Sequence, residues 1–250
     1  MEIININDLT LKYFTKTGET DALKNITLSI NEGDFVSIVG PSGCGKTTLL
    51  NAISQILPAQ NGEITYFNGN EKVRDVTKNF FGYMLQSDEL FPWLTVYKNI
   101  ILPLEIQKIK TPENLAYIHS LITKYGLDGF KNKKPTELSG GMRQRVALIR
   151  TLALRPKVLL LDEPFSALDY VTRINVANDV ANIIKEEHKT AILVTHDIEE
   201  AVSLSSVVVI LTKRPAKLKE VVKLPFKKGE TITDRRERFK LSEWQTKIFD

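Results

Sequence analysis

Eight residues near the start of the chain read Gly40-Pro41-Ser42-Gly43-Cys44-Gly45-Lys46-Thr47. Their spacing fits the phosphate-loop pattern G-x-x-x-x-G-K-[ST], which requires a strand before it and a helix after it. Both are expected here, because the apolar run Phe35–Val39 precedes the loop and an apolar-periodic segment follows it as far as Pro58. The glycines would let backbone N–H groups turn inward around a phosphate, and the start of the helix would add positive potential.

The polar side chains at the end of this loop have expected tasks. We expect Lys46 to reach the β- and γ-phosphates of a nucleotide and Thr47 to offer its hydroxyl to Mg²⁺. Thr48 completes the set of expected nucleotide-binding positions. A structural Gly-rich turn is the alternative interpretation, and it is weak because both flanking elements fit the motif.

A second stretch, Val158–Leu161, reads as a buried strand that ends in two carboxylates, Asp162 and Glu163. Ligands bind at such strand ends in open parallel sheets. Asp162 can hold Mg²⁺, while Glu163 can orient or deprotonate an attacking water. An acidic pair of this kind is more often a solvated turn, but its coexistence with the phosphate loop favours the catalytic interpretation.

The remaining pattern predicts an α/β protein. Residues 2–39 alternate apolar and polar positions, as half-buried strands of an antiparallel layer do. A strand at Glu63–Phe67 meets the hairpin-type pair Asn68-Gly69, and a strand-like run around Phe80–Leu85 is expected to continue that layer. Helices are expected near Thr95–Ile106, Pro112–Tyr125 and Gly140–Leu154.

Strands and helices alternate after this helical block, which indicates a parallel sheet. The expected elements are strands at Val158–Leu161, Ala191–Val194 and Val207–Leu211, a helix through Ala177–Ile184 and a helix from Ile198. The last forty residues predict a short hairpin and one polar helix.

The composition is that of an ordinary globular chain, with 250 residues, 42% hydrophobic and 26% charged. No apolar run approaches the ~18 residues that span a bilayer, and no signal-peptide pattern opens the chain, so a cytoplasmic location is expected. Cys44 is the single cysteine, which excludes an internal disulfide and the usual zinc site. Residues 213–250 carry twelve Lys/Arg against six Asp/Glu. We expect solvated charge there, with contact to lipid or nucleic acid as the alternative.

A third stretch lies at the start of the helix expected at Gly140–Leu154 and reads Leu138-Ser139-Gly140-Gly141-Met142-Arg143-Gln144-Arg145. It resembles the signature motif that separates ABC ATPases from other phosphate-loop enzymes. The resemblance covers essentially the whole chain and keeps the family's order. Gln86 matches the Q-loop, Ser166-Ala167-Leu168-Asp169 matches the D-loop, His196 matches the switch histidine, and Tyr13 sits where the adenine-stacking aromatic is found. Met142 departs from the glutamine common after the signature glycines.

The resemblance implies a RecA-like P-loop ATPase core with an antiparallel β subdomain and a helical subdomain. We expect one ABC ATPase domain over residues 1–250, with the helical subdomain near 88–156 and a C-terminal hairpin and helix near 213–250. The implied cofactors are ATP and Mg²⁺.

The resemblance also implies roles for individual residues. Ser139, Gly140 and Gly141 would bind the γ-phosphate held by the opposite subunit, so a dimer, expected to be a homodimer, is needed to complete a site. Gln86 would assist catalysis and contact the metal, and His196 would contact the γ-phosphate, although a lone histidine at a strand end is more often structural. Whether Tyr13 or Phe14 stacks on adenine stays open.

The stretch after Gln86, Leu90-Phe91-Pro92-Trp93-Leu94-Thr95-Val96, resembles ATPases of importers for nitrate, sulfonates and taurine. The strand Val207–Leu211 followed by Arg214-Pro215 is similar to that group as well. Exposed Phe91 and Trp93 would suit a groove that receives a helix of a membrane subunit, with core packing as the alternative.

The resemblance thus implies an ATP-hydrolysing importer subunit, peripheral at the cytoplasmic face of the membrane, which works with permease subunits and a separate solute-binding protein. The alternatives are a soluble ABC ATPase for nucleic-acid maintenance or for cofactor assembly. The first usually has long heptad arms or two fused cassettes, neither of which is visible, so nucleic acid is not expected as a partner. The second would not require Phe91-Pro92-Trp93. The solute and the choice between homodimer and heterodimer stay open.

Overall fold

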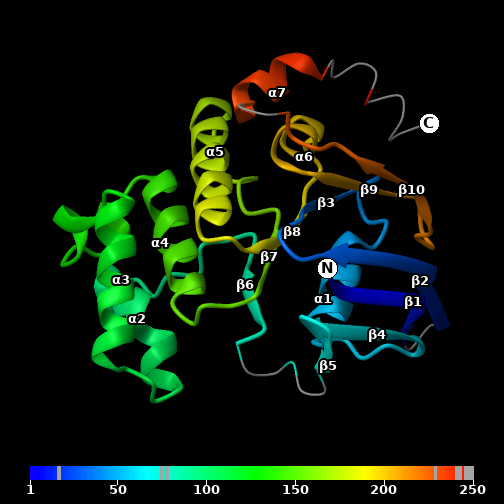
Figure 1. The fold of residues 1–250 in the computed structure, drawn as a ribbon, viewed down its shortest axis with the longest axis horizontal. Coiled ribbons are helices and arrows are strands. Elements are labelled where there is room, and N and C mark those ends of the chain that lie inside the picture. The colour runs from blue at the N-terminus through cyan, green and yellow to red at the C-terminus, as the bar shows by residue number, and fades with distance from the viewer. Residues whose placement is uncertain (16–17, 74–75, 77–78, 228–229, 240–243, 245–250) are drawn as a thin grey trace. The chain divides into compact units, whose positions relative to one another are not determined.

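The computed structural model describes residues 1–15, 18–73, 76, 79–227, 230–239 and 244 (Figure 1). The chain divides into two compact units. The first unit comprises Met1–Val76 and Glu187–Asp250, and the second comprises Thr77–Glu186. Among the described residues, no helix has both the length and the hydropathy to cross a bilayer.

The first unit contains an antiparallel sheet. Its strands are β1 (Glu2–Thr15), β2 (Gly18–Asn31), β4 (Asn61–Asn68) and β5 (Glu71–Val73), in the order β2-β1-β4-β5. Each neighbouring pair is antiparallel. Ile4 and Ile6 of β1 are fully buried while the alternate residue Asn5 is not, as expected for a strand with one face on a core. The predicted antiparallel layer is confirmed.

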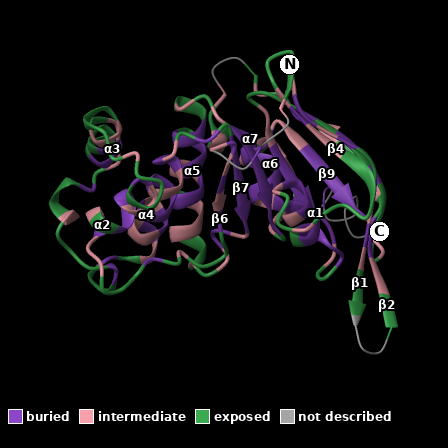
Figure 2. Ribbon diagram, turned by 90° about the horizontal axis from the view of Figure 1, so that it is seen from below, coloured by how far each residue is buried: buried purple, intermediate pink, exposed green. Residues whose placement is uncertain are grey.

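The first unit also contains a set of mostly parallel strands. These are β3 (Phe35–Val39), β8 (Thr190–Val194), β9 (Val207–Leu211) and β10 (Leu218–Lys223), in the order β10-β9-β3-β8. β3 is parallel to β8 and β9, and β10 is antiparallel to β9. The central strands are buried along almost their whole length, as the purple β9 in Figure 2 shows. Their continuous apolar runs fit strands covered on both faces.

Three helices accompany these strands within the first unit. They are α1 (Lys46–Ile53), α6 (Ile198–Leu204) and α7 (Ile232–Arg238). Within the predicted C-terminal segment, residues 213–250, the structure has one strand, β10, which pairs with β9 outside that segment, and the helix α7. Residues 240–243 and 245–250 of the predicted C-terminal segment lie outside the described residues.

The second unit contains the parallel pair β6 (Phe81–Met84) and β7 (Val158–Asp162) and most of the helices. Its helices are α2 (Val96–Ile106), α3 (Pro112–Lys124), α4 (Gly140–Leu152) and α5 (Tyr170–Glu186), with 3₁₀ turns at Asp128–Phe130 and Pro135–Glu137. Helices α2, α3 and α4 have side-chain N-caps. The hydroxyls of Thr95, Thr111 and Ser139 each accept a backbone N–H from the first turn of their helix. The three helices predicted in this block are confirmed.

Two local predictions were wrong. The run around Phe80–Leu85 does not continue the antiparallel layer, because β6 pairs in parallel with β7. The turn after Asn68 instead leads into β5, whose three residues Glu71-Lys72-Val73 are too short and polar to predict as a strand. Helix α1 ends at Ile53, well before Pro58.

Candidate functional site

The phosphate loop lies between β3 and α1 in the first unit, as its motif requires. At Gly40 the backbone passes so close to β9 that a Cβ atom would be 2.9 Å from the carbonyl oxygen of Leu211. Gly45 has a φ of 127°, and a Cβ there would be 3.1 Å from the carbonyl oxygen of Ala22. Both positions therefore require glycine.

Lys46 lies inside this loop and is only 7% exposed. Its ammonium donates to the carbonyl oxygens of Gly40 at 3.1 Å and Pro41 at 3.3 Å. Gly45 caps α1 without a side chain, so the N–H groups of the first helical turn carry no side-chain cap. Ser42 and Gly43 form the exposed rim of the loop. An anion at the loop would therefore meet a cation and helix N–H groups together.

The strand register brings His196 to the edge of the sheet where the phosphate loop begins. Ile38 of β3 is paired with Val194 of β8, and the N–H of Thr195 donates to the carbonyl oxygen of Ile38 at 3.4 Å. Because the two strands are parallel, Gly40 and His196 leave the sheet at the same edge. His196 is exposed, as a residue that reaches a ligand would be.

Tyr13 and Phe14 differ in their surroundings. The Tyr13 hydroxyl lies 3.1 Å from the Thr48 hydroxyl, so the Tyr13 ring turns toward the start of α1. Successive residues of a strand point to opposite faces, and Phe14 is 68% exposed. The geometry thus favours Tyr13 as the aromatic beside the phosphate loop.

Gln86 and Glu163 belong to one hydrogen-bonded group in the second unit. Met84 of β6 is paired with Leu161 of β7, so the residues that follow both strands leave at the same edge. Gln86 Nε2 donates to Ser166 Oγ at 3.3 Å, and Ser166 Oγ donates to the carbonyl oxygen of Glu163 at 2.9 Å. The predicted Q-loop, the predicted D-loop and the backbone of Glu163 are therefore neighbours.

Asp162 and Glu163 lie in different environments although they are adjacent. Asp162 is 9% exposed at the end of β7. Burial, together with the nearby Asp162 carboxylate, raises the pKa of Tyr83, so that this phenol stays neutral. Glu163 has a φ of 46°, a left-handed conformation that is uncommon for residues other than glycine. Such outliers cluster at functional sites.

The signature residues begin α4. The Ser139 hydroxyl accepts the N–H of Met142 at 3.3 Å. A Cβ on Gly140 would lie 2.8 Å from Leu168 Cδ2, and one on Gly141 would lie 2.7 Å from Val176 Cγ2. The two glycines therefore let the start of α4 pack closely against the predicted D-loop and α5.

Two arginines of α4 hold the segment that follows Gln86. Arg143 Nε donates to the Asp88 carboxylate at 2.9 Å. Arg150 donates to the backbone carbonyl oxygens of Asp88 at 2.8 Å and Glu89 at 2.6 Å. Sequence reasoning missed this role, because the partners lie more than fifty residues away and no local pattern marks them.

Phe91 and Trp93 have exposed rings and a fixed backbone. Phe91 is 37% exposed and Trp93 69%, and their ring centroids are 5.1 Å apart. The fully buried Asn99 accepts the N–H of Phe91 at 2.8 Å and donates to its carbonyl oxygen at 3.1 Å. Helix α2 thus presents an apolar pair to solvent in a defined position. No sequence pattern had pointed to Asn99.

Each unit by itself offers an oxygen ligand of the kind that magnesium takes alongside a nucleotide. Among the described residues, no group of three or more His, Cys, Asp or Glu side chains could hold a metal ion. Mg²⁺ is usually held by one or two protein oxygens together with phosphate oxygens and water. The carboxylate of Asp162 and the hydroxyl of Thr47 are ligands of that kind.

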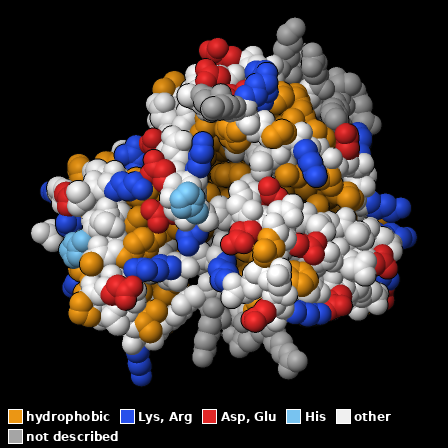
Figure 3. Space-filling view, in the orientation of Figure 1, with side chains coloured by type: hydrophobic (Ala, Val, Ile, Leu, Met, Phe, Trp, Pro, Cys, Tyr) orange, Lys and Arg blue, Asp and Glu red, His pale blue; other side chains and the backbone are white. Residues whose placement is uncertain are grey.

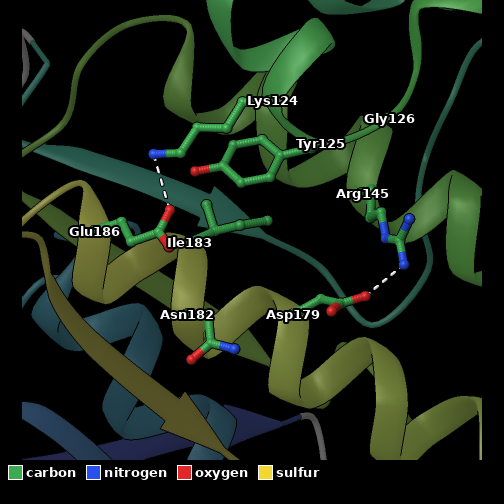
Figure 4. A pocket seen from close by; sticks show the side chains of 8 residues that line it. All are labelled: Lys124, Tyr125, Gly126, Arg145, Asp179, Asn182, Ile183 and Glu186. Atoms are coloured by element: carbon green, nitrogen blue, oxygen red, sulfur yellow. Dashed lines mark hydrogen bonds and ion pairs between the residues drawn. The ribbon is translucent and has the colours of Figure 1, made fainter.

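A pocket of about 430 Å³ in the second unit is unrelated to these residues. It lies among the end of α3, α4 and α5, and none of the predicted site residues lines it (Figure 4). Lys124 pairs with Glu186 at 2.8 Å, and Arg145 pairs with Asp179. Because its charges are already paired, the pocket is a poor receptor for a phosphate.

Comparisons with known proteins show which family the chain is similar to. The family model described as ABC transporter matches residues 23–166. The aliphatic sulfonates import ATP-binding protein SsuB of Bacillus cereus is 41% identical over 230 residues, covering 91% of this chain and 89% of SsuB. The nitrate import ATP-binding protein NrtC of Synechocystis sp. is 44% identical over 212 residues, covering 83% of this chain and 31% of NrtC. A dimeric structure of the ATP-binding cassette MJ0796, in a post-hydrolysis state with ADP and Pi, has a TM-score of 0.73 at 32% identity and covers 90% of this chain and 100% of its own.

Proposed function

The chain belongs to the ABC transporter family and is an ATPase with the P-loop fold that its sequence predicts, and from this premise we propose that it powers uptake of a small solute of the nitrate, sulfonate or taurine type. Relatives named for sulfonate and nitrate import support the proposal. The paired aromatics Phe91 and Trp93 are the observation that carries it, because a cassette that only hydrolysed ATP would gain nothing from exposing them beside Gln86.

In the proposed site the first unit binds the nucleotide. Lys46 would exchange its bonds to the loop carbonyls for bonds to the terminal phosphates, since a buried ammonium is more stable beside an anion. Together with Lys46, the proposed nucleotide-binding residues of the loop are Gly40, Pro41, Ser42, Gly43, Cys44, Gly45, Thr47 and Thr48. Tyr13 would stack on the base, and His196 would contact the γ-phosphate.

The second unit contributes the groups for hydrolysis. Magnesium, when bound, would neutralise charge on the phosphates, with Asp162 and Gln86 of this unit and Thr47 of the first unit as its proposed ligands. Glu163 would orient the attacking water and accept its proton. Ser139, Gly140 and Gly141 would bind the γ-phosphate held by a second subunit, so the working unit would be a dimer.

Three arginines of the basic C-terminal segment are engaged within the chain. Arg236 pairs with Glu199 at 2.5 Å and Arg238 pairs with Glu230 at 3.0 Å, while Arg235 is fully buried. These cations are used within the chain and cannot serve as a phosphate-binding patch. The expectation of mainly solvated charge was wrong for these three residues, but the structure agrees with it at other basic residues of the segment, all exposed: Lys213, Arg214, Lys217, Lys219, Lys223 and Lys227.

Affinity purification of the tagged chain from detergent-solubilised membranes tests the proposal. We expect very hydrophobic permease subunits to co-purify with the wild-type chain. We also expect Lys46→Ala to abolish binding of a fluorescent ATP analogue, since no other side chain of the loop supplies a cation. Deletion of the gene should then impair growth when nitrate, or a sulfonate such as taurine, is the sole nitrogen or sulfur source. Recovery of the chain with nucleic acid and no membrane protein would exclude the importer role.

A further inference from the structure

The C-terminal helix α7 holds the neighbouring helix α6 through an arginine (Figure 1). Arg235 of α7 is fully buried. Its guanidinium donates to the backbone carbonyl oxygens of Val202 at 3.0 Å, Ser203 at 3.0 Å, Ser205 at 2.5 Å and Leu224 at 2.9 Å. Three of these carbonyls belong to the C-terminal end of α6 and the residue that follows it.

The charge of Arg235 suits this position. The last carbonyl groups of a helix lack partners within the helix and carry partial negative charge. The Phe226 ring lies 3.9 Å from the guanidinium carbon, and Glu230 lies 3.8 Å from the guanidinium. Burial lowers the pKa of Arg235 to about 10, so the side chain is still charged at neutral pH.

A second arginine of α7 holds the other end of α6. Arg236 pairs with Glu199, in the first turn of α6, at 2.5 Å. Their side chains are only 15% and 14% exposed, so solvent screens this pair less than a surface pair. Because α6 has seven residues, or about two turns, α7 fixes it at both ends.

The start of α6 is tied to the backbone on both sides of His196. The Asp197 carboxylate accepts the N–H groups of Glu199 at 2.9 Å and Glu200 at 3.2 Å. The Thr195 hydroxyl donates to the Glu200 carboxylate at 2.7 Å and accepts the N–H of Asp197 at 2.9 Å. A shift of α6 would therefore move His196.

Helix α6 also packs toward the strand that carries the phosphate loop. Ile198, Ala201 and Val202 share an apolar cluster with Val39, the residue immediately before Gly40. Figure 3 shows charged side chains of both signs next to hydrophobic ones where α6 and α7 lie, as expected for a packed helix rather than a basic patch. Helix α6 is thus in contact both with α7 and with the strand that ends at the loop.

We infer that α7 is a positioning element for His196, in which Arg235 and Arg236 hold α6 and thereby fix the histidine relative to the phosphate loop. The inference rests on the role proposed for His196. Neither arginine contacts the nucleotide in this account, so loss of either contact should lower the rate of hydrolysis while nucleotide affinity is kept.

Steady-state ATPase kinetics of the full chain with Arg236→Ala and with Glu199→Ala test the inference. We expect kcat to fall about fivefold in each, a typical effect for a lost coupling of this size, with KM and binding of a fluorescent ATP analogue unchanged. The reversed pair, Arg236→Glu with Glu199→Arg, should restore most of the rate. Arg238→Ala is the matched control, because this arginine of α7 pairs with Glu230 and not with α6. We expect it to leave kcat unchanged.

The His196→Ala background separates positioning from general stability. If α7 acts through His196, adding Arg236→Ala to His196→Ala should cause no further loss of rate. Multiplied losses in this double variant, or a normal kcat for folded Arg236→Ala, would overturn the inference. Arg235→Lys, which keeps the charge but makes fewer bonds, should repeat the kcat loss, and its melting curve verifies that the variant is folded. Failure of the proposed function itself appears separately, as a wild-type chain without ATPase activity or as a His196→Ala variant with the wild-type rate.

Discussion

At the scale of single residues, the clearest feature is the strained backbone of Glu163. A left-handed φ of 46° costs a glutamate roughly 1 kcal/mol or more, and the chain tolerates it between the buried strand β7 and the turn in which the N–H of Ser166 donates to the Glu163 carbonyl oxygen. A neighbouring aspartate, Asp162, keeps the ordinary strand geometry.

We predict that Glu163→Gln keeps ATP binding and lowers turnover by on the order of 10²–10⁴, because the amide cannot accept the proton of water. Glutamine has the same shape, so the melting temperature should change little. ATPase assays beside analogue binding measure both effects. Glu89→Gln is a matched control, since Glu89 also has a φ of 46° but is exposed. Equal losses in both variants would show that the effect does not come from base chemistry at Glu163.

Cys44 provides a test that depends on pH. The thiol is buried at 1% exposure, and burial raises its pKa. Since burial disfavours the charged thiolate, and the thiolate is the nucleophile, alkylation of the folded chain at neutral pH should be much slower than that of the urea-unfolded chain. The rate should continue to rise with pH above the range in which the unfolded thiol has levelled off. Iodoacetamide labelling followed by mass spectrometry measures the rates, and equal rates at pH 7 would show that the loop does not shield Cys44.

At the element scale, local signals were enough for some elements and not for others. Helices α2 and α3 could be predicted to within about a residue, because Thr95 and Thr111 cap them and apolar periodicity runs through them. β5 and the partner of β6 could not, since strand pairing depends on contacts between residues distant in the sequence. The phosphate loop after β3 and the carboxylates at the end of β7 could be recognised from the sequence, because binding a phosphate or a metal ion requires particular residue types at fixed spacings.

Contacts between elements were the hardest feature to infer. Arg143 and Arg150 hold the segment after Gln86, and Arg235 holds the end of α6. All of these arginines bind backbone carbonyls or a distant acid, and a sequence does not tell which helix end an arginine will meet. The basic tail therefore resembled solvated charge throughout, although Arg235 is fully buried and Arg236 and Arg238 are partly buried in the first unit.

The start of α4 gives a prediction about packing. In a free helix Gly141→Ala would be favourable by about 1 kcal/mol. Here the added methyl would lie 2.7 Å from Val176 Cγ2, and overpacking of this kind costs about 1–3 kcal/mol. We expect a net loss of stability in urea unfolding, and a gain relative to Val176→Ala when the two changes are combined. Stabilisation by Gly141→Ala alone would mean that α4 and α5 separate without cost.

At the scale of the whole molecule, coupling of ATP hydrolysis to transport requires that a change at the nucleotide site moves a partner subunit. Gln86 and the aromatic pair lie on one segment, which Arg143 and Arg150 of the signature helix α4 hold. Asn99 fixes the backbone of Phe91 to α2. A displacement of Gln86 would therefore also displace Phe91 and Trp93, because the segment between them is held by side chains of α2 and α4.

We predict that Phe91→Ala with Trp93→Ala separates hydrolysis from transport. The rings are 37% and 69% exposed, so their removal should cost the isolated chain far less than the 3–5 kcal/mol per aromatic that a core position loses. Association with the permease should weaken by at least ~2 kcal/mol, because exposed aromatics that fill a partner's groove dominate such interfaces. Basal ATPase activity should survive. Ile106→Ala is the control, since Ile106 is 71% exposed at the far end of α2 and should affect neither property. Thermal melting of the free chain measures its stability, and pull-down of the permease measures the association. A large fall in melting temperature with normal assembly would show that both rings pack in the core. The proposed mechanical link between Gln86 and the membrane would then be lost.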